Sequence, residues 1–274
     1  MAISIEDIKK LRAMTNAGLA DCKKALTEAN GDMEKANELI RERGLAIAAK
    51  RSDREASEGC VLVKAVDGFG AIIALKCETD FVAQNADFVA LTQQILDAAI
   101  ANKCQTLEEV QALVIDGQSV TELVTARSGV TGEKMELDGY LTITGESIST
   151  YNHQGKNQLC TMVALNKTVA EEYGHNVAMQ VAAMNPVSID KDDVPEDIRE
   201  QEFKIAVEKT REEGKPEKMV EQIAMGRMNK FYQEQCLLRQ AYIMDGSLNV
   251  ASYLKQADKD CTVTAFKRFT LRAE

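Results

Sequence analysis

The sequence predicts an α+β fold with two related core halves and antiparallel sheets, and three patterns support this prediction. Residues 59–65 alternate with period two and residues 71–75 form a short β-branched apolar run, both typical of strands. Residues 88–99 repeat apolar side chains every three or four positions, which is typical of an amphipathic helix. A strand pair followed by a helix occurs twice, as expected when helices cover one face of an antiparallel sheet.

The composition indicates a chain that can bury a sizeable core and excludes several classes of protein. Of 274 residues, 45% are hydrophobic and 28% are charged, with no Trp and a net charge of −10, which argues against a general nucleic-acid or anionic-membrane binder. No apolar run approaches the ~18 residues of a membrane span. Acids stand near the first residue where a signal peptide needs basic residues. Seven scattered cysteines without a Cys-x-x-Cys pair favour reduced thiols over disulfides or zinc. We therefore expect a cytoplasmic protein that binds neither nucleic acid nor membrane.

Residues 1–54 form the predicted N-terminal module, three short helices and a charged linker. Ser4 and Asp7 resemble a capping box at the first helix, and Asn30-Gly31 is a suitable end for the second. Gly44 is expected to end the third helix, although residues 45–51 could continue it. The module carries a net charge of +2 and the remainder −12, so it could meet an acidic surface. An ordinary helical subdomain without a partner fits the same pattern.

Residues 55–138 form the predicted first core half, a β-hairpin that turns at Asp67-Gly68 and is followed by helices. The strand pattern changes to a helix pattern at residues 77–82. Thr79 and Asp80 are suitable helix N-caps there, which would explain this junction by local structure alone. A cap does not explain Phe81, because a large aromatic beside an acid either packs inward or is offered to a partner.

Residues 139–274 form the predicted second core half, in which Thr- and Ile-rich strands precede a helix that Asn185-Pro186 stops. An insertion at about residues 195–235 interrupts this half. The pattern there predicts two charged amphipathic helices joined by Gly214-Lys215-Pro216, an antiparallel helical hairpin. Its apolar stripes could mediate self-association or pack on the body of the same chain.

Enzyme motifs are missing from the sequence. The phosphate-binding, dinucleotide-binding, serine-hydrolase and zinc-protease patterns do not occur. His153 and His175 are the only imidazoles and stand far apart in the sequence, so we expect them to be solvated or locally bonded and assign them neither catalysis nor metal binding. We therefore expect a binding or regulatory protein with no catalytic residue, metal ligand or cofactor.

Two stretches resemble the signatures of the translation elongation factor Ts family. They are residues 11–26 (LRAMTNAGLADCKKAL) and residues 77–83 (CETDFVA), in the family's order and spacing. Further similarity runs through residues 178–183, 214–216 and 226–228, so the resemblance covers nearly the whole chain.

The resemblance implies a fold and a function. The family's fold is a ubiquitin-associated-like three-helix module followed by a two-part α+β core with a helical hairpin. The family's function is non-enzymatic guanine-nucleotide exchange, in which GDP leaves the GTPase elongation factor Tu during protein synthesis. The family's equivalent of residues 79–82 enters the GTPase domain beside the magnesium site of the nucleotide.

The family's contact positions carry over onto this chain residue by residue. Phe81 would wedge between helices of the GTPase domain, and Asp80 would help to disturb magnesium coordination. The second core half would grip another domain of the GTPase, in a heterodimer or a dimer of heterodimers. The resemblance implies these partner-binding residues: Thr79, Asp80, Phe81, Val82, Arg12, Leu19, Ala20 and Gln180.

This sequence departs from the family pattern at some of these positions. Gln180 stands where the family often has His, and Leu19-Ala20 is smaller than the Met pair frequent there. Some longer members continue into a C-terminal helix, whose contacts we expect to be absent. Two other hypotheses stay open at this stage, an adaptor built on residues 1–54 and an enzyme of unknown type, and Phe81 could still be a core residue.

Overall fold

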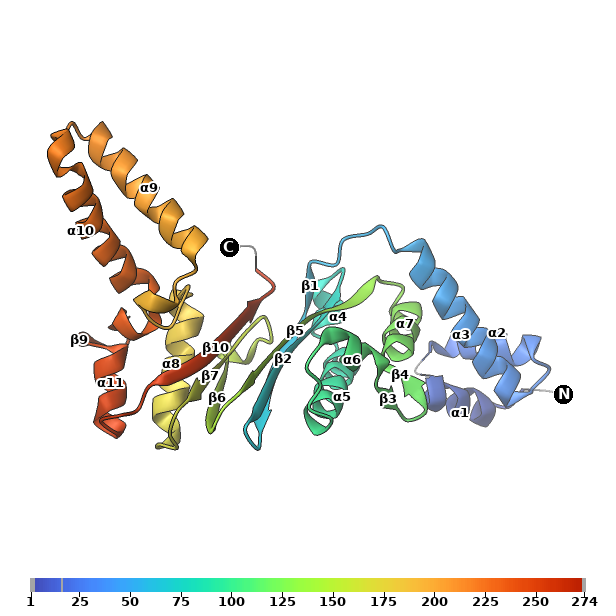
Figure 1. Ribbon diagram of the computed structural model, residues 1–274. Helices are drawn as coiled ribbons and strands as arrows, with labels where there is room; N and C mark the ends of the chain where they lie inside the picture. The colour runs from blue at the N-terminus through green and yellow to red at the C-terminus, as the bar shows by residue number, and fades with distance from the viewer. Residues whose placement is uncertain (1–2, 16, 273–274) are drawn as a thin grey trace. The chain divides into compact units, whose positions relative to one another are not determined.

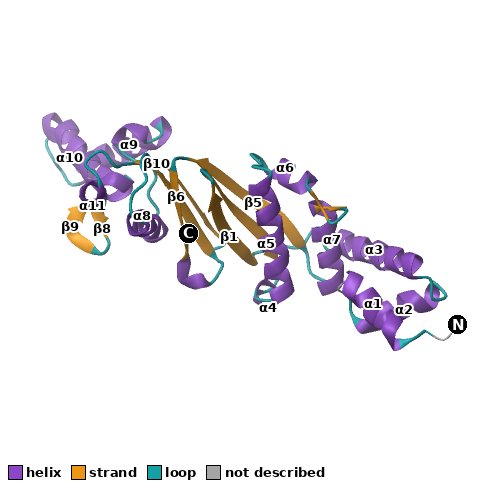
Figure 2. Cartoon of the chain, turned by 90° about the horizontal axis from the view of Figure 1, so that it is seen from below, coloured by secondary structure: helices purple, strands orange, loops and turns teal. Residues whose placement is uncertain are grey.

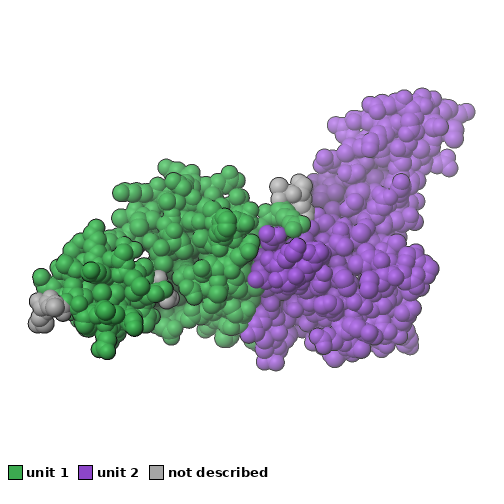
Figure 3. Space-filling model, turned by 180° about the vertical axis from the view of Figure 1, so that it is seen from behind, with its two compact units in different colours: residues 1–62, 72–141, 270–274 green, residues 63–71, 142–269 purple. Residues whose placement is uncertain are grey.

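The computed structural model describes residues 3–15 and 17–272 (Figure 1). The chain divides into two compact units, shown in separate colours in Figure 3. Unit 1 comprises Met1–Leu62, Ile72–Leu141 and Thr270–Glu274, and unit 2 comprises Val63–Ala71 and Thr142–Phe269.

Unit 1 begins with three helices, α1 (Ile5–Thr15), α2 (Leu19–Glu28) and α3 (Met33–Lys50). The predicted capping box at α1 is confirmed, because the Ser4 hydroxyl accepts from the Asp7 amide at 3.0 Å and the Asp7 carboxylate accepts from the Ser4 amide at 3.3 Å. The sequence Thr-Asn-Ala-Gly at residues 15–18 predicts a turn between the first two helices, and residue 16 of that stretch lies outside the described residues. The three helices share a small core of buried side chains: Leu11, Ala17, Cys22, Ala25, Leu26, Ala29 and Ala36.

The prediction that Gly44 ends the third helix is wrong. α3 continues through Gly44 to Lys50, and Gly44 is buried in its interior. A Cβ built on Gly44 would meet the Cα of Gly129 at 3.5 Å. A glycine in the middle of a helix usually weakens it, and 3.5 Å is an ordinary contact, so Gly44 is neither a helix end nor sterically required at this position.

The first sheet has the strand order β1-β2-β5. Its strands are β1 (Glu58–Val66), β2 (Phe69–Cys77) and β5 (Met135–Thr144). The predicted turn between β1 and β2 is confirmed, since Asp67 and Gly68 both have positive φ, 48° and 74°, as tight hairpin turns require. β2 is buried along nearly its whole length, which explains its continuous apolar run.

Of the helices of unit 1 that follow β2, α4 and α6 are short and α5 and α7 are longer (Figure 2). These helices are α4 (Asp80–Ala83), α5 (Ala86–Ala101), α6 (Leu107–Ala112) and α7 (Val120–Thr131). A two-stranded sheet, β3 (Val114–Ile115) with β4 (Gln118–Ser119), separates the last two. α7 packs along α3, so the N-terminal helices and the core half share an interface within unit 1.

Unit 2 contains a second sheet with the strand order β10-β7-β6. Its strands are β6 (Ser147–Asn152), β7 (Leu159–Leu165) and β10 (Val263–Thr270), and β6 pairs antiparallel with β7 so that Ser149 faces Val163. The helix α8 (Glu171–Met184) packs against β6 and β7. The remaining short elements of this unit are η1 (His153–Gly155), η2 (Lys191–Asp193), η3 (Leu237–Arg239), β8 (Ala241–Tyr242), β9 (Asp245–Asn249) and α11 (Val250–Ala257).

Two long helices of unit 2, α9 (Glu196–Glu212) and α10 (Glu217–Gln235), pack against each other (Figure 1). The connection between them contains Gly214 with φ 71°, a left-handed conformation that favours glycine. Few of their side chains are buried, which agrees with the high charge of this segment.

The α+β fold class with antiparallel sheets is confirmed. The ubiquitin-associated-like character of the first helices and the boundaries at residues 54 and 138 stay predictions. Within residues 3–15 and 17–272, no helix is both long and apolar enough to cross a membrane.

Candidate partner-binding site

The predicted contact residues 79–82 lie where β2 passes into α4. Thr79 is the N-cap of α4, and its hydroxyl accepts from the Val82 amide at 3.4 Å. Asp80 and Phe81 are the first two residues of that helix, and both are exposed. The Phe81 side chain is 85% exposed, so the hypothesis that it is a core residue is wrong. Val82 is half-buried.

Glu133, which lies more than fifty residues further along the chain, holds the start of this turn by hydrogen bonds. Its Oε2 accepts from the backbone amides of Glu78 and Thr79, both at 3.1 Å. Its Oε1 accepts from the Thr79 hydroxyl at 2.6 Å. Hydrogen bonds to a carboxylate are about twice as strong as those between neutral groups, so one side chain anchors the whole entry to α4.

Glu78 connects the same turn to the segment that follows α3. Its carboxylate accepts from the Lys134 amide at 2.6 Å, from Arg54 at 2.9 Å and from Arg51 at 3.0 Å. These contacts lower the pKa of Glu78 to about 2, chiefly through the hydrogen bond from the Lys134 amide and then through the two guanidinium groups. The Glu78 carboxylate is therefore ionised at neutral pH and ties three segments together.

Cys77 precedes the turn and is fully buried. Its thiol donates to the carbonyl oxygen of Thr79 at 3.2 Å. Burial, reinforced by the nearby Glu133 charge, raises the pKa of this thiol to about 12. Cys77 is thus a packed core residue and not a nucleophile. The other six cysteines are buried as well.

The predicted N-terminal contact residues lie on other elements of unit 1. Arg12 is on α1, and Leu19 and Ala20 begin α2; all three are exposed. The Leu19 side chain is 50% exposed, which makes it available to a partner. Two more apolar residues of this module, Ile5 and Met14, are similarly exposed at 71% and 55%.

Gln180 has no exposed surface, so the structure places this predicted contact residue in the interior of unit 2. Its Nε2 donates to the Gln240 side chain and to the Ala241 carbonyl, both at 3.1 Å. Its Oε1 accepts from the Ile243 amide at 2.9 Å. Every polar atom of Gln180 therefore holds the segment around β8, and any effect of Gln180 on a partner passes through that segment.

Sequence patterns missed the residues that this segment exposes. Ile243 and Met244 lie between β8 and β9 and are 38% and 64% exposed. An apolar pair inside a short loop carries no periodicity, so only its exposure in the fold reveals it. The pair is the part of unit 2 that Gln180 positions.

The two histidines gather at one tyrosine of unit 2. Tyr151 bonds through its hydroxyl to His153 Nδ1 at 3.1 Å, and its ring lies edge-on to His175 with the centroids 5.4 Å apart. Both histidines therefore have local partners, one of the two environments expected for them. In residues 3–15 and 17–272, no three His, Cys, Asp or Glu side chains gather in a way that could hold a metal ion.

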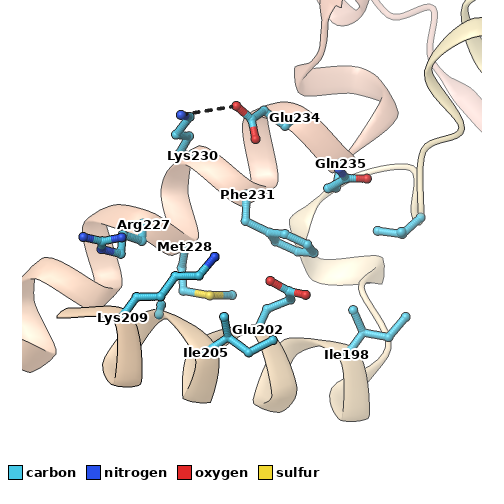
Figure 4. A pocket seen from close by; sticks show the side chains of 12 residues that line it. Ile198, Glu202, Ile205, Lys209, Arg227, Met228, Lys230, Phe231, Glu234 and Gln235 are labelled. Carbon is cyan, nitrogen blue, oxygen red and sulfur yellow. Dashed lines mark ion pairs between the residues drawn. The ribbon is translucent and has the colours of Figure 1, made fainter. Parts of the chain in front are cut away.

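A hollow of about 540 Å³ lies between α9 and α10 (Figure 4). Its apolar lining includes Ile198, Ile205, Met228 and Phe231. Lys230 and Glu234 form an ion pair at its edge with 3.6 Å between Nζ and Oε1. A second hollow of about 670 Å³ in unit 1 is lined by residues of α3, α5 and α7. Neither hollow contains the predicted contact residues.

Comparison with known proteins gives one consistent result. A family model described as Elongation factor TS matches residues 78–273. The chain is 51% identical over 330 aligned positions to Elongation factor Ts of Bacteroides fragilis, and equally to that of Phocaeicola vulgatus, with 100% of each chain covered. It is 51% identical over 275 positions to Elongation factor Ts of Porphyromonas gingivalis, again with 100% of each chain covered.

Proposed function

The chain belongs to the elongation factor Ts family, and we propose that it is a guanine-nucleotide exchange factor for the translational GTPase elongation factor Tu. One observation carries the proposal. Phe81 is 85% exposed at the tip of a turn that several hydrogen bonds hold in place. A solitary protein gains nothing from exposing a large aromatic side chain on a held turn, whereas an interface uses such a residue as its anchor.

Phe81 and Asp80 act together on the nucleotide site of the partner. Magnesium and the phosphate-binding loop jointly hold the diphosphate of a GTPase nucleotide, so disturbing either one speeds its release. Phe81 wedges between helices of the GTPase domain and displaces them. The Asp80 carboxylate is exposed beside Phe81 and helps to disturb the coordination of the magnesium ion. GTP then rebinds, and no covalent step is needed.

Exchange of this kind is negative coupling between two ligands of one protein. The factor weakens the hold of the GTPase on GDP, and linkage requires GDP to weaken the hold of the GTPase on the factor by the same ratio. Rebinding of GDP therefore favours release of the factor from the GTPase.

Further contacts extend the interface beyond the turn. On the N-terminal module, Arg12, Leu19 and Ala20 touch the same GTPase domain, and their exposure supports this assignment. On unit 2, the exposed Ile243 and Met244 touch a second domain of the partner, and the buried Gln180 fixes the loop that presents them. Thr79 and Val82 contribute by shaping the turn. The complex is a cytoplasmic heterodimer or a dimer of heterodimers.

The test is a stopped-flow measurement of fluorescent GDP release from elongation factor Tu, with and without this protein. We expect the release rate to rise with protein concentration and to saturate. The expected absence of catalysis is checked in a separate sample, in which this protein without elongation factor Tu should not hydrolyse GTP. Unchanged GDP release at a saturating concentration of this protein would refute the proposal.

A further inference from the structure

The turn that carries Phe81 has too little packing of its own to keep one orientation. α4 has four residues, and none of them is buried. A single helical turn does not persist in water, because its few hydrogen bonds do not offset the entropy of ordering the backbone. The orientation of Asp80 and Phe81 must therefore come from the groups that hold the two ends of α4.

Glu133 fixes the backbone at the N-terminal end of α4. The Thr79 hydroxyl donates a hydrogen bond to Glu133 Oε1 at 2.6 Å, which leaves the lone pairs of that hydroxyl oxygen available to accept from the Val82 amide at 3.4 Å. Glu133 Oε2 fixes the backbone just before the helix through two amides. One carboxylate thus sets both the direction in which the chain enters α4 and the cap of that helix.

Arg127 fixes the chain at the C-terminal end of α4. Its Nη2 donates to Asn85 Oδ1 at 2.9 Å and lies 3.2 Å from Asp87 Oδ2. The same Asn85 oxygen caps α5 by accepting from the Asp87 amide at 3.0 Å. Arg127 is 8% exposed, so losing the contacts that its Nη2 makes to Asn85 and Asp87 would leave a buried charge without a partner, and this cost holds Asn85 in place.

Both holding groups come from α7 or from the residue just after its C-cap. Arg127 lies inside α7, and Glu133 follows Gly132, whose left-handed φ of 73° ends that helix. The Ser128 hydroxyl donates to the Glu133 carbonyl at 2.5 Å, and the Glu133 amide donates to the Thr131 hydroxyl at 3.3 Å. The Glu133 carboxylate is therefore presented from a rigid helix end and not from a loose loop.

We propose that α7 is a clamp on the exposed turn, with Glu133 and Arg127 as positioning residues that orient Phe81 and Asp80 toward the partner. This inference rests on the proposed function, because orientation matters only if Phe81 enters another protein. The clamp removes the ordering cost that a mobile turn would incur at docking, which is the general benefit of preorganisation.

The experiment is a double-mutant cycle read by stopped-flow GDP release at saturating factor. Glu133→Ala should lower the maximal release rate at least tenfold. In a background that carries both Asp80→Ala and Phe81→Ala, the same substitution should change the rate less than twofold, because both side chains that Glu133 positions are already gone. Glu133→Gln should retain much of the rate, since its amide can accept from the backbone amides and donate to the Thr79 hydroxyl. Glu136→Ala is the matched control, because Glu136 is exposed on β5 and pairs with Lys134 rather than with the turn.

A second measurement uses the free protein and needs no partner. Backbone hydrogen exchange over residues 80–84 should be at least tenfold faster in Glu133→Ala and in Arg127→Lys than in the wild type, and unchanged in Glu136→Ala. Equal exchange in all four proteins would overturn the clamp. Additive rate losses in the cycle would also overturn it, because they would indicate a general loss of structure. A wild type that fails to accelerate GDP release would refute the proposed function, and the hydrogen-exchange result would still decide whether the clamp exists.

Discussion

Gly44 of α3 and Gly129 of α7 lie against each other, backbone to backbone. A Cβ built on Gly129 would lie 2.2 Å from the Cα of Gly44, while a Cβ built on Gly44 would lie 3.5 Å from the Cα of Gly129. Arg41 and Glu122 form an ion pair between the same two helices. The N-terminal helices are thus docked on the helix that carries Arg127 and leads to Glu133.

The asymmetry of this crossing predicts unequal effects of two similar substitutions. Gly129→Ala should destabilise unit 1 by about 2–4 kcal/mol, because a methyl group cannot fit at 2.2 Å and the helices must separate. Gly44→Ala meets only an ordinary contact and gains up to about 1 kcal/mol of helix propensity, so it should be neutral or stabilising. Denaturant unfolding measures both. Equal losses in the two variants would contradict this close crossing of α3 and α7.

Phe81 and Phe88 provide a matched pair that separates function from stability. Phe81→Ala should slow factor-stimulated GDP release at least tenfold and leave the unfolding free energy within about 0.5 kcal/mol, because the side chain is exposed. Phe88 is fully buried, so Phe88→Ala should cost about 3–5 kcal/mol. Stopped-flow exchange and chemical unfolding of both variants check this. A large stability loss in Phe81→Ala with normal exchange would assign Phe81 a structural role instead.

Acid should weaken unit 1 through Glu78. Its folded-state pKa of about 2 lies below the ordinary value of 4.5, so the ionised form is favoured by folding. The stabilisation is therefore complete above pH 4.5 and is lost as the pH falls from 4.5 through about 2. Glu78→Gln should be less stable than the wild type at neutral pH, and the two melting curves should converge towards pH 2. Melts from pH 2 to 7 test this, with Glu136→Gln as control; a constant gap across that range would contradict it.

Local patterns predicted much of the fold, because helix and strand periodicity depends on near neighbours. The hairpin turn at Asp67-Gly68 and the strand-to-helix junction at Thr79 are examples. Gly44 shows where this reasoning fails. A glycine after a helical pattern normally indicates a helix end, but α3 continues through Gly44 to Lys50 and packs along α7, a contact between segments far apart in the sequence.

Some residues of the candidate site could be predicted from the sequence and others could not. The turn that carries Asp80 and Phe81 could be located from sequence, because a cap and an unexplained aromatic stand together. Glu133 and Arg127 could not, because they lie more than forty residues away and hold the turn only after the chain has folded. The burial of Gln180 had one signal, its position three residues after Val177 and next to Val181 on the apolar face of α8.

Gln180 should contribute to stability more than its polar side chain suggests. Gln180→Met keeps the shape of the side chain but removes the bonds that Gln180 makes to the Ile243 amide, the Ala241 carbonyl and Gln240 Oε1. The bond between Gln180 and Gln240 is buried, and a buried group left unpaired costs about 1–3 kcal/mol, so unit 2 should lose about that much and the loop of Ile243 should exchange its amide hydrogens faster. Gln222→Met on the exposed face of α10 is the control and should be nearly neutral. Loss of affinity for elongation factor Tu in Gln180→Met, together with faster exchange at Ile243, would show that Gln180 acts through this loop. Loss of affinity without any change in that loop would favour a direct contact by Gln180.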